Sequence, residues 1–209
     1  MGNQMFQYAV GRSLAERRQT ELKLDLTFLL NRLPRKDFVF RDYDLGIFNI
    51  TENLTFLSRL AMKNKIARDV SYLASRLYLE TRNIFDKKYW AREKQNYFFD
   101  ENILKLPSNV YLDGYWQSYK YFENIDNLIR EEFIFKFDFN EKESKMAREI
   151  QSVNSVCINI RRGDYVSNPV NSKFFEVLGV DYYKQAEVII KGRVSEPHFF
   201  VFSDDADWC

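Results

Sequence analysis

Apolar residues recur at helical spacing at the start of the chain. Phe6, Val10 and Leu14 lie four residues apart, while Arg12 and Glu16 occupy other faces. Side chains separated by three or four positions share one face of a helix. The pattern therefore predicts an amphipathic helix that begins almost at the first residue.

Two further patterns follow in the first half of the chain. Residues 21–26 (ELKLDL) alternate polar and apolar side chains, which predicts a short strand. Residues 53–94 are expected to be mostly helical, because an apolar stripe recurs there at helical spacing. The stripe consists of Leu60, Ile66, Leu73 and Leu77, and the basic residues around it are Lys63, Lys65, Arg68 and Arg76. We interpret these basic residues as a solvated helix face rather than a binding patch.

The second half of the chain predicts alternating elements. Residues 109–113 (NVYLD) read as a short strand that Gly114 ends, and helices are expected over 121–133 and 141–152.

A strand, a helix and another strand then follow. Residues 155–160 (SVCINI) form an apolar run typical of a buried strand, in which Cys157 behaves as a small hydrophobe. A helix over 181–191, with Asp181 as its N-cap, leads to a second buried strand, 198–202 (HFFVF). This order indicates a βαβ unit of a parallel sheet.

The fold class expected from these elements is α/β with two domains, residues 1–150 and 151–209. The first domain opens on a helix with no strand before it, and the second holds two strands and one complete helix. Because domains of this class are usually longer, we expect a first strand and more than half of the second domain to be missing.

Composition excludes several classes of function. The chain has 31 Lys and Arg against 30 Asp and Glu, so a mainly electrostatic grip on nucleic acid is not expected. Two cysteines cannot form a disulfide framework, which favours a cytoplasmic location. No apolar run approaches the ~20 residues of a spanning helix, so any membrane contact would be peripheral.

Cofactor and metal motifs are also absent from the sequence. The seven glycines give neither the dinucleotide GxGxxG pattern nor the P-loop spacing. The one histidine, His198, supports neither a zinc site nor a conventional triad and is expected to be structural.

Candidate chemistry lies where the predicted parallel strands end. Arg161 and Arg162 follow the first strand, and paired guanidinium groups can hold an anion. Alternatively, one of them forms a structural ion pair with Asp164. Ser203, Asp204 and Asp205 follow the next strand, where carboxylates can accept hydrogen bonds from a nucleoside or cap the following helix. We expect capping for at least one of them.

Asn3 stands at the start of the first helix. The backbone N–H groups there favour an anion, although Asn3 is equally an ordinary N-cap residue.

Four segments of the chain match a family pattern in order. They are residues 2–9 (GNQMFQYA), 113–118 (DGYWQS) with Tyr121 and Phe122, 160–165 (IRRGDY), and 202–205 (FSDD) with Trp208. Together they resemble the α-1,2-fucosyltransferases of glycosyltransferase family 11, and the match covers essentially the whole chain. The resemblance implies two Rossmann-like domains facing a cleft (GT-B type), the second of them incomplete here. It also implies transfer of L-fucose from GDP-fucose to the 2-hydroxyl of a galactose-terminated acceptor, with inversion and with no metal or other cofactor.

The resemblance assigns roles to individual residues. It implies that Arg161 and Arg162 neutralise the diphosphate of the donor as it leaves, and that Asp164 orients an arginine or receives the acceptor proton. Asn3 would lie near the same phosphates. The end of the other strand would also bind the sugar donor, through Ser203, Asp204 and Asp205. The DGYWQS segment would line the acceptor side, through Tyr115, Trp116 and Gln117. The alternative for the last three is that they only pack the domain.

Three departures from the family pattern stand out. Asn159 replaces the family's histidine, the leading GGL is reduced to Met1, and a later Ser-Phe-Ser-Trp-Trp segment is not present in residues 1–209. Two alternatives to the galactoside fucosyltransferase remain. The two shortened ends and Asn159 favour a non-catalytic fragment of the same fold, and the basic strand-end loop is similar to that of the protein O-fucosyltransferases, whose acceptor is a folded protein domain.

Overall fold

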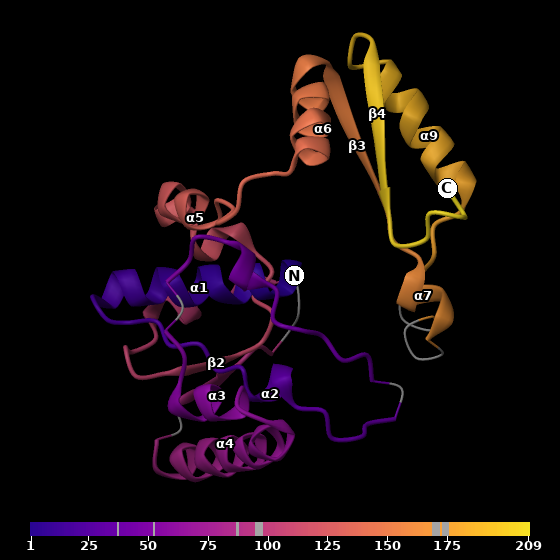
Figure 1. Cartoon of the computed structure of the whole chain (residues 1–209). Helices are drawn as coiled ribbons and strands as arrows, with labels where there is room; N and C mark the ends of the chain where they lie inside the picture. Colours follow the sequence, from indigo (N-terminus) through magenta and orange to yellow (C-terminus); the bar gives the residue numbers. More distant parts are fainter. Residues whose placement is uncertain (37, 52, 87, 95–97, 169–171, 173–175) are drawn as a thin grey trace. The chain divides into compact units, whose positions relative to one another are not determined.

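The computed structural model describes residues 1–36, 38–51, 53–86, 88–94, 98–168, 172 and 176–209 (Figure 1). In these residues the chain is a mixed α/β protein with two small parallel sheets of two strands each. It divides into two compact units. Unit 1 comprises Met1–Pro34 and Phe40–Phe137, and unit 2 comprises Arg35–Val39 and Asp138–Cys209. The change of unit after Phe137 leaves the helix over 141–152 with unit 2, whereas the sequence places a domain boundary near residue 150.

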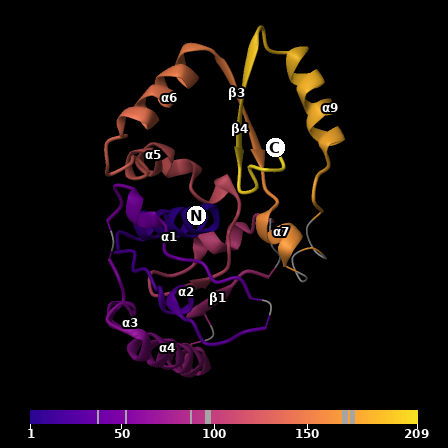
Figure 2. The same ribbon diagram turned by 45° about the vertical axis from the view of Figure 1, so that its right-hand side comes forward.

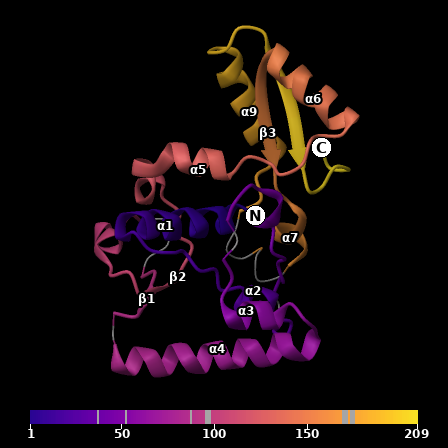
Figure 3. The ribbon, with the colours of Figure 1, turned by 60° about the vertical axis from the view of Figure 1, so that its left-hand side comes forward.

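Helix α1 (Gly2–Arg18) forms the centre of unit 1 and confirms the first predicted helix. Its residues Tyr8 and Ala9 belong to one apolar cluster, and Val10 and Leu14 belong to another. Figures 1 and 3 show α1 between α5 on one side and the α3–α4 pair on the other. The two apolar clusters therefore pack against different faces of α1.

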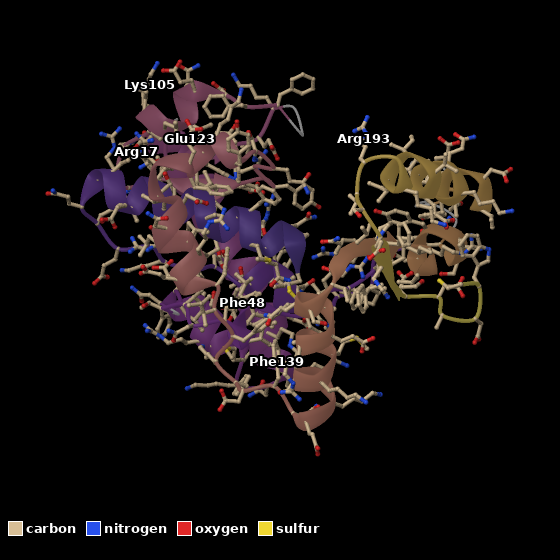
Figure 4. All side chains as sticks on the ribbon, turned by 90° about the horizontal axis from the view of Figure 1, so that it is seen from above. Arg17, Phe48, Lys105, Glu123, Phe139 and Arg193 are labelled. Atoms are coloured by element: carbon tan, nitrogen blue, oxygen red, sulfur yellow. The ribbon has the colours of Figure 1, made fainter. Side chains whose placement is uncertain are left out.

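Aromatic rings fill the first of these cores. Phe48, labelled in Figure 4, is buried, and its ring centroid lies 5.1 Å from that of Phe133 and 5.3 Å from that of Phe135. An isolated antiparallel bridge joins Phe48 to Phe135. The high aromatic content of the sequence is therefore used in packing at this point.

The strand predicted over residues 21–26 is not formed. Leu24 makes a single parallel bridge to Leu54, and the chain then turns into the short helix α2 (Thr27–Leu30). The carboxylate of Asp25 causes the turn, because its Oδ1 atom accepts the backbone N–H of Thr27 at 2.9 Å. A local side-chain hydrogen bond has replaced the ladder that alternation alone predicts.

The region 53–94 is helical only in part. It contains α3 (Phe56–Ala61), α4 (Lys65–Phe85) and a strand that the sequence analysis missed, β1 (Trp90–Arg92). Strand β1 pairs in parallel with β2 (Tyr111–Asp113), which confirms the strand predicted over 109–113. Three residues are too few to show a period, so β1 was not readable from pattern.

The predicted apolar stripe of this region does not face the core. The buried residues of α4 are Ser71, Ser75 and Leu79, whereas Leu73 and Leu77 are exposed. Helical spacing identifies residues that share a face, but it does not identify which face meets the rest of the fold.

Short helical turns complete unit 1. They are η1 (Leu45–Ile47), η2 (Glu101–Lys105), η3 (Tyr119–Tyr121), η4 (Glu123–Ile125) and α5 (Asp126–Glu132). The helix predicted over 121–133 is thus broken into pieces.

Unit 2 contains the predicted βαβ unit. Its elements are α6 (Glu141–Ser152), β3 (Asn154–Ile160), α7 (Gly163–Ser167), α9 (Val180–Lys191) and β4 (Pro197–Ser203). Strands β3 and β4 are parallel over seven residue pairs, and α6 and α9 flank them (Figure 2). Helix α6 begins with a capping box between Asn140 and Glu143. Helix α9 is capped by Gly179, so the assignment of Asp181 as its N-cap is wrong; Asp181 lies in the first turn.

The strands of unit 2 are less buried than their sequences predict. Ile160 is the one buried residue of β3, and Cys157 and His198 are exposed. In the described chain the sheet has only these two strands, so each has an edge without a neighbour. Cys157 is therefore not the buried small hydrophobe that the apolar run indicates.

No helix in the described ranges combines the length and the apolarity that a membrane crossing requires.

Candidate functional site

The parallel register of unit 2 brings the two predicted strand-end loops together. Ile160, the last residue of β3, is paired with Ser203, the last residue of β4. Arg161 and Arg162 therefore leave the sheet beside Asp204 and Asp205. The carboxyl ends of adjacent parallel strands are the usual place for a ligand in an open α/β sheet.

Asp204 holds the loop that follows β3. Its Oδ1 atom accepts the backbone N–H of Arg162 at 2.7 Å and that of Gly163 at 3.1 Å. These two donors stabilise the charged carboxylate and lower the pKa of Asp204 below its usual value. Asp204 thus holds the first N–H groups of α7, whereas the prediction that one of these residues caps a following helix is wrong, because residues 204–209 form no helix.

Gly163 allows this close approach. A Cβ atom at Gly163 would lie 2.8 Å from Oδ2 of Asp204, which is closer than non-bonded carbon and oxygen atoms pack. A side chain at this position would push the carboxylate off the two N–H groups that it accepts.

Arg162 is fixed by two contacts from the loop after β4. Its Nε atom donates to Oδ2 of Asp205 at 3.0 Å, and its guanidinium carbon lies 4.2 Å from the ring centroid of Trp208. Ser203 supports Asp205, whose backbone N–H donates to the Ser203 hydroxyl at 2.9 Å. Within the described residues, the two terminal nitrogens of Arg162 make no hydrogen bond, so they are available to an anion.

Arg161 is held by its own loop. Its Nη2 atom lies 3.1 Å from Oδ1 of Asp164, and its guanidinium carbon lies 4.6 Å from the ring centroid of Tyr165. The structural ion pair considered from the sequence is therefore present. It does not exclude anion binding, because a guanidinium has five N–H donors and this pair uses one nitrogen.

The charges of this loop pair do not by themselves attract an anion. The two guanidinium groups face three carboxylates, those of Asp164, Asp204 and Asp205. An anion is therefore favoured only where it contacts the guanidinium N–H groups directly, in the planar geometry that arginine provides.

Asn3 meets the DGYWQS segment within unit 1. The side-chain nitrogen of Gln117 donates to Oδ1 of Asn3 at 2.6 Å, and that of Gln7 donates to the carbonyl of Gly114 at 2.8 Å. Met1, not Asn3, is the N-cap of α1, so the reading of Asn3 as the N-cap is wrong. Two of the matching motifs are thus joined by side-chain hydrogen bonds.

Trp116 lies in the core of unit 1. It is 2% exposed, and its ring packs edge-on against Tyr121 with centroids 6.0 Å apart. Its backbone φ of 55° lies in the left-handed region, a strained conformation for a residue of this size. Burial favours the alternative that Trp116 packs the domain, whereas Tyr115 is exposed and Gln117 is half-buried.

The left-handed backbone conformation of Trp116 is stabilised by a residue that the sequence analysis did not identify. Glu93 accepts the backbone N–H groups of Tyr115 at 2.7 Å and of Trp116 at 3.2 Å. Glu93 lies 22 residues earlier in the chain, just after β1, and no local pattern links it to the motif.

Comparison with known proteins gives a family and several relatives. The family model of glycosyl transferase family 11 matches residues 1–209. An alpha-1,2-colitosyltransferase of Escherichia coli is 31% identical over 212 residues, which cover 100% of this chain and 67% of the relative. The O-antigen biosynthesis glycosyltransferase WbnK of Escherichia coli is 31% identical over 221 residues, covering 100% and 71%.

A more distant relative comes from an animal. The galactoside alpha-(1,2)-fucosyltransferase 2 of Pongo pygmaeus is 30% identical over 128 residues, which cover 57% of this chain and 37% of the relative. No solved structure matches the chain.

Proposed function

The chain belongs to glycosyl transferase family 11, and from that membership we propose that it transfers L-fucose from GDP-fucose to the 2-hydroxyl of a galactoside. The proposed reaction inverts the anomeric carbon. The fucosyltransferases among its relatives support fucose as the transferred sugar and a galactoside as the acceptor. The observation that carries the proposal is the pair of arginines fixed at the end of β3.

The two arginines would stabilise the negative charge that builds up on the diphosphate as it leaves. Hydrogen-bond donors that already point at a developing charge stabilise the transition state without having to reorganise. Asp205 and Trp208 hold the guanidinium of Arg162 in one orientation, with its terminal nitrogens open to a phosphate. Arg162 is therefore the principal contact to the diphosphate in this proposal, and Arg161 is the second.

Asp164 and Asp204 act as positioning residues in this scheme. The carboxylate of Asp164 is engaged by Arg161 at 3.1 Å, which supports the role of orienting that arginine over the role of accepting the acceptor proton. Asp204 fixes the backbone from which both arginines project. Ser203 and Asp205 complete the donor side, toward the nucleoside.

The acceptor is assigned to unit 1. Tyr115 offers an exposed aromatic ring, which suits the C–H face of a sugar, and Gln117 and Asn3 offer side-chain amides beside it. The two units would correspond to the two Rossmann-like domains of a GT-B enzyme, with the donor bound mainly by the second.

A colitosyl donor is the second candidate. The alpha-1,2-colitosyltransferase relative aligns with the entire chain, whereas the fucosyltransferase of Pongo pygmaeus aligns with 57% of it. The change of donor would leave the diphosphate contacts unaltered, because both donors would present the same leaving group.

Competing donors test the proposal directly. The chain is incubated with a β-galactoside and either GDP-fucose or GDP-colitose, and the product is identified by mass and by the linkage in its NMR spectrum. We expect a fucosylated product substituted at the 2-hydroxyl. A colitosylated product alone would move the assignment to the second candidate.

If no transfer is observed, a measurement of GDP binding distinguishes an inactive fragment that keeps the donor site from a chain that has no donor site. Tight GDP binding by calorimetry without transfer would support the non-catalytic alternative, and no binding at all would contradict the donor site. Transfer to a folded protein domain, but not to the galactoside, would support the protein O-fucosyltransferase alternative. Arg162→Ala should weaken GDP binding, and Arg193→Ala, on an exposed arginine after α9, is the matched control (Figure 4).

A further inference from the structure

Helix α4 packs on unit 1 through a face of small and polar residues. Its buried side chains are Ser71, Ser75 and Leu79, which follow one another at four-residue spacing. The hydroxyl of Ser75 donates to Asp25 at 2.9 Å, and Leu79 packs with Tyr89 and Trp90. The contacts that hold α4 therefore come from one side of the helix.

The opposite side of α4 is apolar and exposed. Five aliphatic side chains at spacings of four, three, four and seven residues form one stripe, and each is between 55% and 77% exposed. They are Ile66, Val70, Leu73, Leu77 and Ile84, and we call them the α4 apolar face. Figure 3 shows α4 along its full length at the rim of unit 1. Folded proteins rarely expose this many aliphatic side chains along one side of a helix unless that side meets a partner.

Exposed positive charge lies at the two ends of this face, whereas Arg68, Arg76 and Arg82 lie on the packed side of α4. Residues 55–94 contain ten Lys and Arg against four Asp and Glu, although the whole chain has a formal charge of only +1. No acidic residue occurs in 55–68, where Arg59, Lys63 and Lys65 are exposed beside the first turn of α4. Lys88 is exposed just beyond the other end of the helix.

We propose that the α4 apolar face docks on an anionic lipid bilayer. An amphipathic helix lies in the membrane interface with its apolar side in the acyl boundary, and basic residues next to it contact anionic headgroups. The fold leaves the α4 apolar face of this 21-residue helix uncovered, and exposed basic residues lie beside both of its ends.

The charge distribution favours a bilayer over a second copy of the chain. Two copies would bring the exposed Arg59, Lys63, Lys65 and Lys88 of one chain toward the same residues of the other, and the repulsion would oppose association. The seven-residue spacing of Ile66 and Leu73 also continues to Glu80, a charged residue that pairs with Arg76 at 3.8 Å. A paired helix seam would bury this glutamate, whereas a bilayer surface leaves it at the edge, in contact with water.

Vesicle binding tests the proposal with the full chain and without donor or acceptor, so its outcome is independent of the proposed function. The protein is sedimented with vesicles of phosphatidylcholine alone or of phosphatidylcholine with phosphatidylglycerol. We expect binding to the anionic vesicles, weakened by salt, and little binding to the neutral ones.

Matched variants separate the two contributions. The double variant Leu73→Glu/Leu77→Glu should lower binding to anionic vesicles by about tenfold or more, because it places charge in the acyl boundary. Lys63→Glu/Lys65→Glu should lower it by a similar factor by removing headgroup contacts. Val188→Glu in α9, at a side chain 71% exposed in unit 2, is the control and should bind as the unaltered chain does.

Three results would overturn the proposal. The first is equal binding to neutral and anionic vesicles. The second is binding that neither Leu73→Glu/Leu77→Glu nor Lys63→Glu/Lys65→Glu changes. The third is a dimer in light scattering that Leu73→Glu/Leu77→Glu dissociates while vesicles bind neither form, since the occupant would then be a second copy.

Discussion

Oδ1 of Asp204 lies 2.7 Å from the backbone nitrogen of Arg162, so a residue that follows β4 fixes the loop that follows β3. The same oxygen accepts the next N–H, that of Gly163. Adjacent parallel strands end at the same edge of a sheet, and here one carboxylate ties both ends together. The orientation of the two arginines therefore depends on a residue 42 positions away from the first of these N–H groups.

Replacing Asp204 with alanine should loosen this loop. Loss of a capping side chain costs about 1 kcal/mol of stability, and the backbone N–H groups of Arg162 and Gly163 lose their acceptor. We expect faster hydrogen exchange at these two amides and a higher KM for the nucleotide-sugar donor. Asp207→Ala, at an exposed aspartate of the same loop, is the control. Unchanged exchange at both amides would contradict the capping role.

Acid should weaken unit 2 through the same residue. The pKa of Asp204 lies below its usual value of 3.8 because two backbone N–H groups donate to the charged carboxylate. As the pH falls, the unfolded chain therefore binds this proton first. The stabilisation is complete above about pH 5 and is lost as the pH falls through the folded-state pKa. Urea unfolding of the unaltered chain should show a steeper loss of stability below this pH than that of Asp204→Asn, whereas Asp207→Asn should behave as the unaltered chain.

Arg162 should be essential for transfer. We expect Arg162→Ala to reduce kcat by on the order of a hundredfold or more, the typical loss when a positioned charge stabiliser is removed. Arg162→Lys should recover little, because an ammonium cannot keep both the Asp205 contact and the planar stacking on Trp208. Steady-state kinetics near those of the Arg193→Ala control would contradict the diphosphate role.

Tyr115 and Trp116 should respond differently to truncation. Trp116→Ala removes a buried ring from the core and should cost about 3–5 kcal/mol of unfolding free energy. Tyr115→Ala changes an exposed side chain, so stability should be retained while the acceptor KM rises. Urea unfolding and acceptor kinetics on the two variants check this. A stable Trp116→Ala variant would show that the ring does not support the core.

The sequence predicted regular elements where a period extends over several turns or pairs. Helices α1, α6 and α9 lie where the sequence predicts them, although Asn3 and Asp181 are not the N-caps, and β3 and β4 follow from their apolar runs. It missed β1, which is too short to show a period, and it predicted a strand over residues 21–26, where Asp25 turns the chain into α2. Local hydrogen bonds decide such short segments, and a pattern of polarity does not contain them.

The candidate site divides in a similar way. The βαβ order by itself determined that Arg161, Arg162, Asp204 and Asp205 would meet, because parallel strands end at one edge of a sheet. Only the tertiary structure decided that Asp204 caps α7, that Glu93 holds the backbone of Trp116, and that the stripe of α4 faces outward. Spacing along the chain fixes which residues share a face or an edge. Which other segment packs on that face depends on contacts between residues far apart in sequence, and a local pattern contains no information about those contacts.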